Sequence, residues 1–351
     1  MARALELAQR GLYTTTPNPR VGCVIVRDGI VVGEGWHERA GGPHAEAIAL
    51  DAAGAQAANA TAYVTLEPCA HHGRTPPCAD ALVRAGLSSV VAAMADPNPL
   101  VSGKGLTRLR EAGVNVRVGV MEEEDRELNI GFVSRMSRGR PWVRTKIAAS
   151  LDGRTALLNG SSQWITGVEA RRDAHHWRAR ACAVLTGIGT VKQDDPQLTV
   201  REVETTRQPL RVVVDSRLEI SPAARIVGTG TLIATAVRDE AREAALTAHG
   251  ASVALLPNIA GRVSLPDLLR ALAACDVNEL HVEAGAGLNG SLLQEGLVDE
   301  LLIYLAPHIM GDKARGMFDV PALTELAQRR EFDITEVRMI GSDLRVIARM
   351  R

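Results

Sequence analysis

Apolar residues in the first 136 positions follow two alternating periods. Short runs rich in Val, Ile and Ala predict strands at 21–26, 30–35, 61–66, 88–94 and 114–120. A turn at 27–29 joins the first two strands as a hairpin. Segments with helical spacing predict helices at 1–12, 44–54, 76–86, 104–113 and 122–136. Strands that alternate with helices in this way indicate an α/β layered domain.

A short basic stretch at 137–142, which contains Gly139 and Pro141, interrupts this alternation. A new succession of apolar runs and helical segments then extends from 142 to 307, with enough apolar residues for a second core. The two halves share no visible period. Because 351 residues are also too many for one ordinary core, we predict two different domains, 1–139 and 140–351.

Composition narrows the class of protein. The chain has 40 Lys and Arg against 41 Asp and Glu, and only 3% aromatic residues, so we expect no nucleic-acid surface. No apolar run approaches the roughly 18 residues of a membrane span, and we expect neither a membrane segment nor a secretory signal. Five cysteines, a sparse and odd number, favour a reducing compartment, the cytoplasm. We expect Cys23, Cys182 and Cys275 to be small core residues.

Two separate segments carry candidate metal ligands, HAE at 44–46 and EPCAHHGRTPPC at 67–78. His44, Cys69 and Cys78 would supply one nitrogen and two sulfurs to Zn²⁺, and a catalytic zinc site keeps three protein ligands and one open position. Glu46 is poorly spaced to be a fourth ligand, but suits a general acid/base beside a zinc-activated water. The alternative is a closed structural site with a fourth ligand from His71 or His72.

The order His-x-Glu, then Pro-Cys and a second Cys, is typical of zinc-dependent nucleobase deaminases, in which the glutamate is not a ligand. Those enzymes usually have two residues between the cysteines, whereas eight separate Cys69 from Cys78. This difference argues against an ordinary cytidine or tRNA adenosine deaminase. Two alternatives stay open: a nucleic-acid-editing zinc deaminase with an accessory domain, and a non-enzymatic zinc module joined to a nucleotide-sensing domain.

A glycine pattern, Gly285-x-Gly287-x-x-Gly290, lies between a predicted strand and a predicted helix. Such glycines let backbone approach a phosphate at a helix N-terminus. The pattern comes late in the chain, however, and the first downstream acids, Asp299 and Glu300, come too early to bind a ribose. We therefore reject a Rossmann domain and keep the phosphate-binding interpretation.

Several linked motifs occur in order: TPNPRVGCVIV, TLEPCAHHGRTPPC, DPNP, SLDGRTA, SQWIT, DDPQLTVR and HVEAGAGLNGSLL. With them the sequence resembles, over essentially its whole length, the bifunctional riboflavin-biosynthesis deaminase–reductase family. The resemblance implies a cytidine-deaminase-like three-layer domain followed by a dihydrofolate-reductase-like domain. It also implies deamination of a diaminopyrimidinone bearing a phosphorylated ribosylamino group, followed by NADPH-dependent reduction of the ribosyl group to ribityl.

In the deaminase half, the resemblance implies that Glu46 is catalytic and that zinc is bound by His44, Cys69 and Cys78. Substrate contacts are expected at Asn18, His71, Arg74 and Asn98. Ordinary turn chemistry is the alternative for the two asparagines, which are flanked by proline. The role of His72 stays open.

In the reductase half, the resemblance implies substrate contacts at Ser162, Arg178, Leu198, Arg201 and Glu283, the arginines suiting a phosphate. NADPH contacts are expected at Ala148, Trp164, Thr190, Asp194, Ser216, Gly285, Ala286, Gly287, Leu288, Asn289, Gly290 and Ser291. Asp194 would also be catalytic, as a polar group close to the transferred hydride. An ordinary core tryptophan is the alternative for Trp164, and Lys146 has an open role. A dimer or tetramer that acts on a small molecule is expected.

Overall fold

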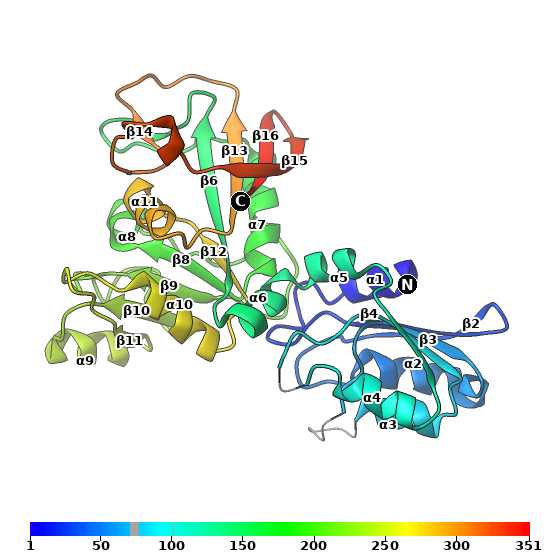
Figure 1. Ribbon diagram of the computed structural model, residues 1–351. Coiled ribbons are helices and arrows are strands. Elements are labelled where there is room, and N and C mark those ends of the chain that lie inside the picture. Colours follow the sequence, from blue (N-terminus) through cyan, green and yellow to red (C-terminus); the bar gives the residue numbers. More distant parts are fainter. Residues whose placement is uncertain (71–76, 100) are drawn as a thin grey trace. The chain divides into compact units, whose positions relative to one another are not determined.

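The computed structural model describes residues 1–70, 77–99 and 101–351. The chain divides into two compact units, Met1–Arg140 and Pro141–Arg351 (Figure 1). His71, His72 and Arg74, which the sequence singled out, lie outside the described residues.

The first unit is built on a five-stranded sheet with the order β2-β1-β3-β4-β5. Its strands are β1 (Gly22–Arg27), β2 (Ile30–Trp36), β3 (Thr61–Leu66), β4 (Ser89–Met94) and β5 (Asn115–Val118). β1 is antiparallel to β2 and to β3, whereas β3, β4 and β5 are parallel. Parallel neighbours need crossover connections, and helices supply them here.

Helices cover both faces of this sheet (Figure 1). α2 (Ala45–Ala53), α3 (Cys78–Arg84) and α4 (Lys104–Glu111) lie on one face, and α1 (Ala2–Gln9) and α5 (Glu122–Leu128) on the other. A single 3-10 turn, Gly54–Ala57, follows α2. Glycines in the strands allow the close approach: a Cβ on Gly22 would lie 2.0 Å from the Ala4 carbonyl oxygen, and one on Gly35 2.5 Å from that of Ala45. The predicted three-layer α/β arrangement is confirmed.

The helix predicted at 122–136 is two helices, α5 and α6 (Ile130–Arg138), which meet at Asn129. The Asn129 side chain accepts a hydrogen bond from the Arg20 backbone N–H (2.8 Å) and donates one to the Arg20 carbonyl oxygen (3.0 Å). It also donates to Oδ1 of the Asp125 carboxyl group (3.0 Å). Since these bonds to Arg20 span 109 residues, the periodicity of the segment could not reveal the break.

The second unit contains a nine-stranded sheet with the order β11-β10-β9-β8-β12-β6-β13-β16-β15. Its strands are β6 (Trp142–Ser150), β8 (Ala183–Gly187), β9 (Leu210–Val214), β10 (Thr231–Thr235), β11 (Ser252–Leu255), β12 (Glu279–Val282), β13 (Glu300–Ala306), β15 (Phe332–Ile340) and β16 (Asp343–Met350). The first seven in this order are parallel, and β16 and β15 are antiparallel. The C-terminal hairpin formed by β15 and β16 lies beyond the alternation recognised in the sequence.

The helices of the second unit are α7 (Val168–Arg180), α8 (Ile188–Asp194), α9 (Glu240–Ala248), α10 (Leu265–Ala274) and α11 (Ala286–Gln294), with a 3-10 turn at Leu326–Gln328. A small sheet pairs β7 (Arg154–Ala156) with β14 (Arg315–Gly316). α8 follows directly on β8, and α11 follows β12 after three residues, so both helices begin at the carboxyl edge of the sheet, where α/β proteins bind ligands.

The predicted burial of three cysteines is confirmed for two of them. Cys23 and Cys182 are buried as predicted, but Cys275 is exposed at the end of α10, so its assignment to the core was wrong. An apolar helix face buries only the residues that point inward, and Cys275 follows the last helical turn. Within the described residues, no helix combines the length and the apolar character that crossing a membrane requires.

Candidate functional site

The three predicted metal ligands lie together at one end of the first unit's sheet. His44 is the residue before α2, Cys69 follows β3, and Cys78 begins α3. His44 Nδ1 lies 3.3 Å from Cys78 Sγ and 3.7 Å from Cys69 Sγ, and all three ligand atoms are within 4.8 Å of one another. Tetrahedral zinc bonds of about 2.0–2.3 Å place ligand atoms about 3.3–3.8 Å apart, so this donor set fits a zinc ion with an open position.

The residues around Cys69 favour the metal-binding form of its thiol. Hydrogen bonds from the Cys78 thiol and from His44 lower the pKa of Cys69, because each stabilises the thiolate. The Cys78 backbone N–H, at the start of α3, also donates to Cys69 Sγ (3.4 Å). Thiolate is the form of cysteine that binds metal.

Glu46 lies in the first turn of α2, buried beside this cluster with 4% of its surface exposed. Burial raises the pKa of Glu46 to about 7, since the charged carboxylate loses its hydration. Its side chain is hydrogen-bonded to Cys78. A carboxyl group with this pKa can both take and return a proton near neutral pH.

Asn18 is held next to the cluster by a histidine that the sequence analysis did not single out. The His37 ring donates from Nδ1 to the Pro43 carbonyl oxygen (2.9 Å), which leaves Nε2 to accept from Asn18 Nδ2 (3.0 Å). The His37 ring also lies edge-on to the His44 ring, with 5.7 Å between centroids. The buried His37 therefore fixes the orientation of the Asn18 amide beside the predicted ligands.

Asn98 lies in the turn after β4, where its backbone N–H donates to Asp96 Oδ1 (2.8 Å), as turn chemistry alone would predict. The loop after β4 is held in place by Glu67, a second residue that the sequence did not single out. The buried Glu67 carboxylate accepts hydrogen bonds from the backbone N–H groups of Asp96 (3.0 Å), Gly103 (2.9 Å) and Gly105 (2.8 Å). Because Glu67 precedes Pro68 and Cys69, it couples this loop to the ligand segment.

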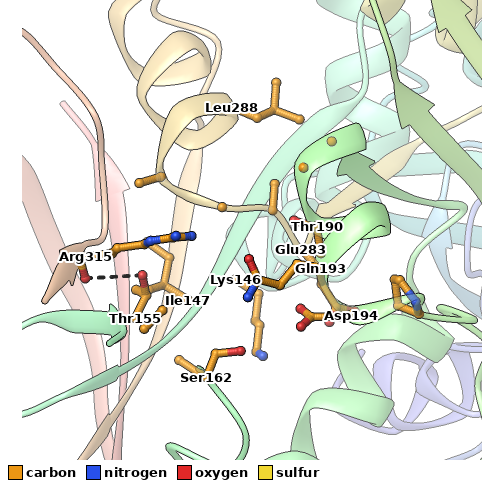
Figure 2. A pocket seen from close by; sticks show the side chains of 18 of the residues that line it. Lys146, Ile147, Thr155, Ser162, Thr190, Gln193, Asp194, Glu283, Leu288 and Arg315 are labelled. Carbon is orange, nitrogen blue, oxygen red and sulfur yellow. Dashed lines mark hydrogen bonds between the residues drawn. The ribbon is translucent and has the colours of Figure 1, made fainter. Parts of the chain in front are cut away.

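A cavity of about 1340 Å³ opens in the second unit, large enough for a dinucleotide and a substrate. Most of the predicted reductase residues line it: Ala148, Ser162, Trp164, Arg178, Thr190, Asp194, Leu198, Arg201, Glu283, Gly285, Ala286, Gly287 and Leu288. Figure 2 shows the side chains of Lys146, Ser162 and Asp194 projecting into one hollow. The fold thus brings together residues that are up to 140 positions apart in the sequence.

Four predicted cofactor residues are not among those lining the cavity, and each has another contact. Ser216 Oγ accepts from the Val263 N–H (3.0 Å), and Ser291 Oγ donates to the Gly287 carbonyl oxygen (3.0 Å). Asn289, 2% exposed, donates to the Ala284 carbonyl oxygen (3.2 Å). A Cβ on Gly290 would lie 2.0 Å from the Asp319 carbonyl oxygen. Residues 286–294 are helical, so of this glycine-rich stretch only Gly285, with an extended backbone, lies before the helix.

Two of the residues that line the cavity, Arg178 and Glu283, form an ion pair. Arg178 donates to the two Glu283 carboxylate oxygens (2.8 and 3.0 Å) and to the Thr199 carbonyl oxygen (2.7 Å). Burial alone would raise the pKa of Glu283, but the charges of Arg178 and Lys146 outweigh it and hold the pKa well below its usual range. Burial lowers the pKa of Lys146, although Glu283 opposes the shift. Much of the Arg178 guanidinium is therefore already committed to protein contacts.

Arg201, Trp164 and Asp194 lie at more open positions. Arg201 is exposed and its guanidinium donates to Thr199 Oγ1 (3.1 Å). Trp164 is 69% exposed, with the Arg171 guanidinium 4.6 Å from its ring centroid, so the alternative of a core tryptophan was wrong. Burial raises the pKa of Asp194. These side chains offer a cation, a flat apolar face and a carboxyl group to a bound molecule.

Fold and site define a class of protein, a two-domain enzyme that joins a zinc-binding deaminase domain to a reductase domain. Residues 1–94 match the family model described as the cytidine and deoxycytidylate deaminase zinc-binding region. Residues 141–346 match the model described as the RibD C-terminal domain.

Relatives match over nearly the whole chain. The riboflavin biosynthesis protein RibD of Escherichia coli is 50% identical, and the match covers 98% of this chain and 96% of that protein. The RibD of Aquifex aeolicus is 44% identical, with coverage of 98% and 96%. The chain belongs to the RibD family, the bifunctional deaminases and reductases of riboflavin biosynthesis.

Solved structures show the same similarity. The Acinetobacter baumannii RibD has a TM-score of 0.93 at 46% identity, covering 100% of this chain and 97% of that one. A Thermotoga maritima diaminohydroxyphosphoribosylaminopyrimidine deaminase/5-amino-6-(5-phosphoribosylamino)uracil reductase has a TM-score of 0.88 at 34% identity, with the same coverage. Both units of this chain thus have solved counterparts within one polypeptide.

Proposed function

We propose that the first unit deaminates a diaminopyrimidinone that carries a phosphorylated ribosylamino group, and that the second unit reduces the ribosyl group of the product to ribityl. The observation that carries the proposal is the cluster of His44, Cys69 and Cys78 with the buried Glu46 beside it. The name of the Thermotoga maritima relative, which specifies such a pyrimidine deaminase and reductase, supports the substrate class.

For the deamination, His44, Cys69 and Cys78 would hold a zinc ion. When bound, zinc would supply Lewis-acid activation of a water molecule near neutral pH. The Glu46 carboxylate would take one proton of that water and pass it to the ring nitrogen, and would then take the second proton from the new hydroxyl group on the carbon and pass it to the departing amine. Asn18, oriented by His37, lines the pocket for the base. We further propose that Asn98, His71 and Arg74 contact the ribose or its phosphate.

For the reduction, NADPH would supply the hydride, delivered to C1′ of the ring-opened ribosylamino group. The start of α11 with Gly285, Ala286, Gly287 and Leu288 binds the cofactor phosphates, because helix N-termini favour anions. The other proposed cofactor contacts are Ala148, Trp164, Thr190, Asp194, Ser216, Asn289, Gly290 and Ser291. Asp194 is a polar group close to the transferred hydride.

The substrate phosphate of the second reaction is assigned chiefly to Arg201, an exposed residue that lines the cavity. Arg178 contributes its charge from within its pairing with Glu283. Ser162 and Leu198 complete the proposed substrate contacts. Lys146 lies in the same hollow and helps to orient the sugar (Figure 2).

One assay tests both activities. Purified protein, zinc, the diaminopyrimidinone nucleotide and NADPH are combined, while ammonia and the absorbance of NADPH are followed together. Glu46→Gln should abolish ammonia release, while zinc content and NADPH oxidation on the pre-deaminated substrate remain. The exposed Glu38→Gln is a matched control that should keep both activities. Retained deamination in Glu46→Gln would show the proposed mechanism to be wrong.

Two properties complete the proposal. A dimer or tetramer is proposed from the family resemblance, and light scattering with chromatography measures it. The cytoplasm is proposed as the location because the few cysteines in the chain suit a reducing compartment, and cell fractionation tests it.

A further inference from the structure

The segment from Leu198 to Gln208 carries two of the proposed substrate residues, Leu198 and Arg201, to the cavity. Leu198 has a φ of 52°, in the left-handed region that residues other than glycine rarely adopt. Local preference therefore does not set the course of this segment. Contacts from elsewhere in the fold must hold it in place.

Helix α7 and the end of the segment itself provide these contacts at three consecutive residues. Arg178 of α7 donates to the Thr199 carbonyl oxygen (2.7 Å). The Gln208 side chain accepts from the Val200 N–H (2.8 Å) and donates to the Val200 carbonyl oxygen (3.1 Å). His175 of α7 accepts from the Arg201 backbone N–H through Nδ1 (3.3 Å). The backbone that carries the Arg201 side chain is thus held by hydrogen bonds at Arg201 and at the two residues before it.

The far end of the segment is tied to the same helix. Arg207 donates to the carbonyl oxygens of Ala181 and Ala179 (both 2.9 Å), at the C-terminal end of α7. Cations suit this position, because helix carbonyl groups there lack partners. α7 therefore holds the segment at Thr199, Arg201 and Arg207.

The chemistry of His175 suits a fixed acceptor. A backbone N–H can only donate, so Nδ1 carries no proton and the ring hydrogen is on Nε2. His175 is 9% exposed, and burial together with the charges of Arg178 and Arg201 lowers its pKa to about 4. The ring is neutral at the pH of an ordinary assay, and keeps Nδ1 as an acceptor.

From these contacts we propose that His175 and Gln208 are positioning residues for the anionic substrate of the reductase. By holding the backbone of Val200 and Arg201, they aim the Arg201 guanidinium into the cavity. Neither residue needs to touch the substrate or the cofactor. This inference rests on the phosphate-binding role proposed above for Arg201.

The test compares two substitutions at one position. His175→Leu removes the acceptor, whereas His175→Asn keeps one, since Asn Oδ1 takes the place of Nδ1. His175→Leu should raise KM for the pre-deaminated nucleotide about fivefold to tenfold, the effect of one lost hydrogen bond, with kcat and the Kd for NADPH within about twofold. His175→Asn should stay close to the unsubstituted enzyme. The adjacent exposed His176→Leu is the matched control and should change none of these values.

A double-mutant cycle with Arg201→Ala decides whether His175 acts through Arg201. The effect of His175→Leu on KM should largely vanish when Arg201 is already alanine. Gln208→Leu should show the same dependence. An unchanged KM in His175→Leu, a parallel loss of NADPH affinity, or full additivity with Arg201→Ala would overturn the positioning role.

The outcomes separate this inference from the proposed function. If Arg201→Ala raises KM and His175→Leu does not, the positioning role alone is wrong. If His175→Leu raises KM while Arg201→Ala does not, the phosphate role of Arg201 is wrong, and the segment is held for Leu198 instead.

Discussion

The glycine pattern at the start of α11 gives a sharp prediction, because its glycines lie in different surroundings. A Cβ on Gly290 would lie 2.0 Å from the Asp319 carbonyl oxygen and 2.7 Å from its carbonyl carbon. At Gly287, a Cβ would meet nothing within 4 Å. Both residues are helical, so alanine suits their backbone equally. Gly290→Ala and Gly287→Ala therefore differ in packing, and of the two residues only Gly287 lines the cavity.

The expected loss of stability in Gly290→Ala follows from the short approach to the Asp319 carbonyl oxygen. An ordinary Cβ contact begins near 3.4 Å, so the Gly290→Ala side chain must push the Asp319 segment about 1.4 Å from α11. Overpacking of this kind costs about 1–3 kcal/mol. The hydrogen bond from the Asp319 N–H to the Ala286 carbonyl oxygen (2.9 Å) would be weakened, at about 1 kcal/mol. The gain of helix propensity from alanine offsets up to about 1 kcal/mol.

We therefore expect Gly290→Ala to destabilise the second unit by about 1–3 kcal/mol. For a unit of this size, each kcal/mol lowers Tm by about 2–4 °C. Scanning calorimetry of the full chain should show a lower Tm for one transition only. Gly287→Ala should keep or raise Tm, while weakening NADPH binding in a titration followed by cofactor fluorescence. An unchanged Tm in Gly290→Ala, or a Tm loss as large in Gly287→Ala, would refute this division between packing and binding.

Three further predictions follow from buried charges and from the metal ligands. Arg144, 1% exposed, pairs with Glu279 (3.0 Å) and with Glu300, which also pair with Arg180 (2.7 Å) and Arg349 (3.1 Å), respectively. Arg144→Leu should cost about 3 kcal/mol in urea unfolding by removing one of the two cations beside each buried carboxylate; an unchanged midpoint would contradict this. Burial raises the pKa of Asp125 from 3.8 to about 8, so the folded state keeps a proton that the unfolded chain releases, and stability should fall as pH rises between these values. Asp125→Asn should flatten that fall when unfolding is measured near pH 5 and near pH 8, and an equally steep decline would argue against the assignment. Removal of zinc with a chelator should stop ammonia release and spare NADPH oxidation on the pre-deaminated substrate; equal loss of both activities would show that the two sites are not independent.

Much of the architecture could be predicted because strand and helix periods are local properties. The runs at 61–66 and 88–94 become β3 and β4, and the two α/β units follow from alternation of this kind. Boundaries that depend on distant contacts could not be predicted. Asn129 ends a helix because its amide pairs with Arg20, and the hairpin of β15 and β16 exists because β16 pairs with β13.

The candidate sites divide in the same way. Residue type and motif order alone singled out His44, Glu46, Cys69 and Cys78, because few side chains bind zinc or transfer protons near neutral pH. Only the tertiary structure identified His37, which orients Asn18, and Glu67, which orders the loop beside Cys69. His37 lies outside the quoted motifs, and the place of Glu67 at the start of the segment 67–78 does not reveal its role.

The glycine pattern and the two arginines show most clearly where prediction from the sequence ends. By itself the sequence determined that Gly285, Gly287 and Gly290 form one pattern and that Arg178 and Arg201 are cations able to bind phosphate. The tertiary structure decided that Gly290 packs against Asp319, and that Arg178 is paired with Glu283 while the exposed Arg201 lines the cavity. The physical reason is that the role of a side chain depends on which partners fold against it, and those partners are distant in the sequence.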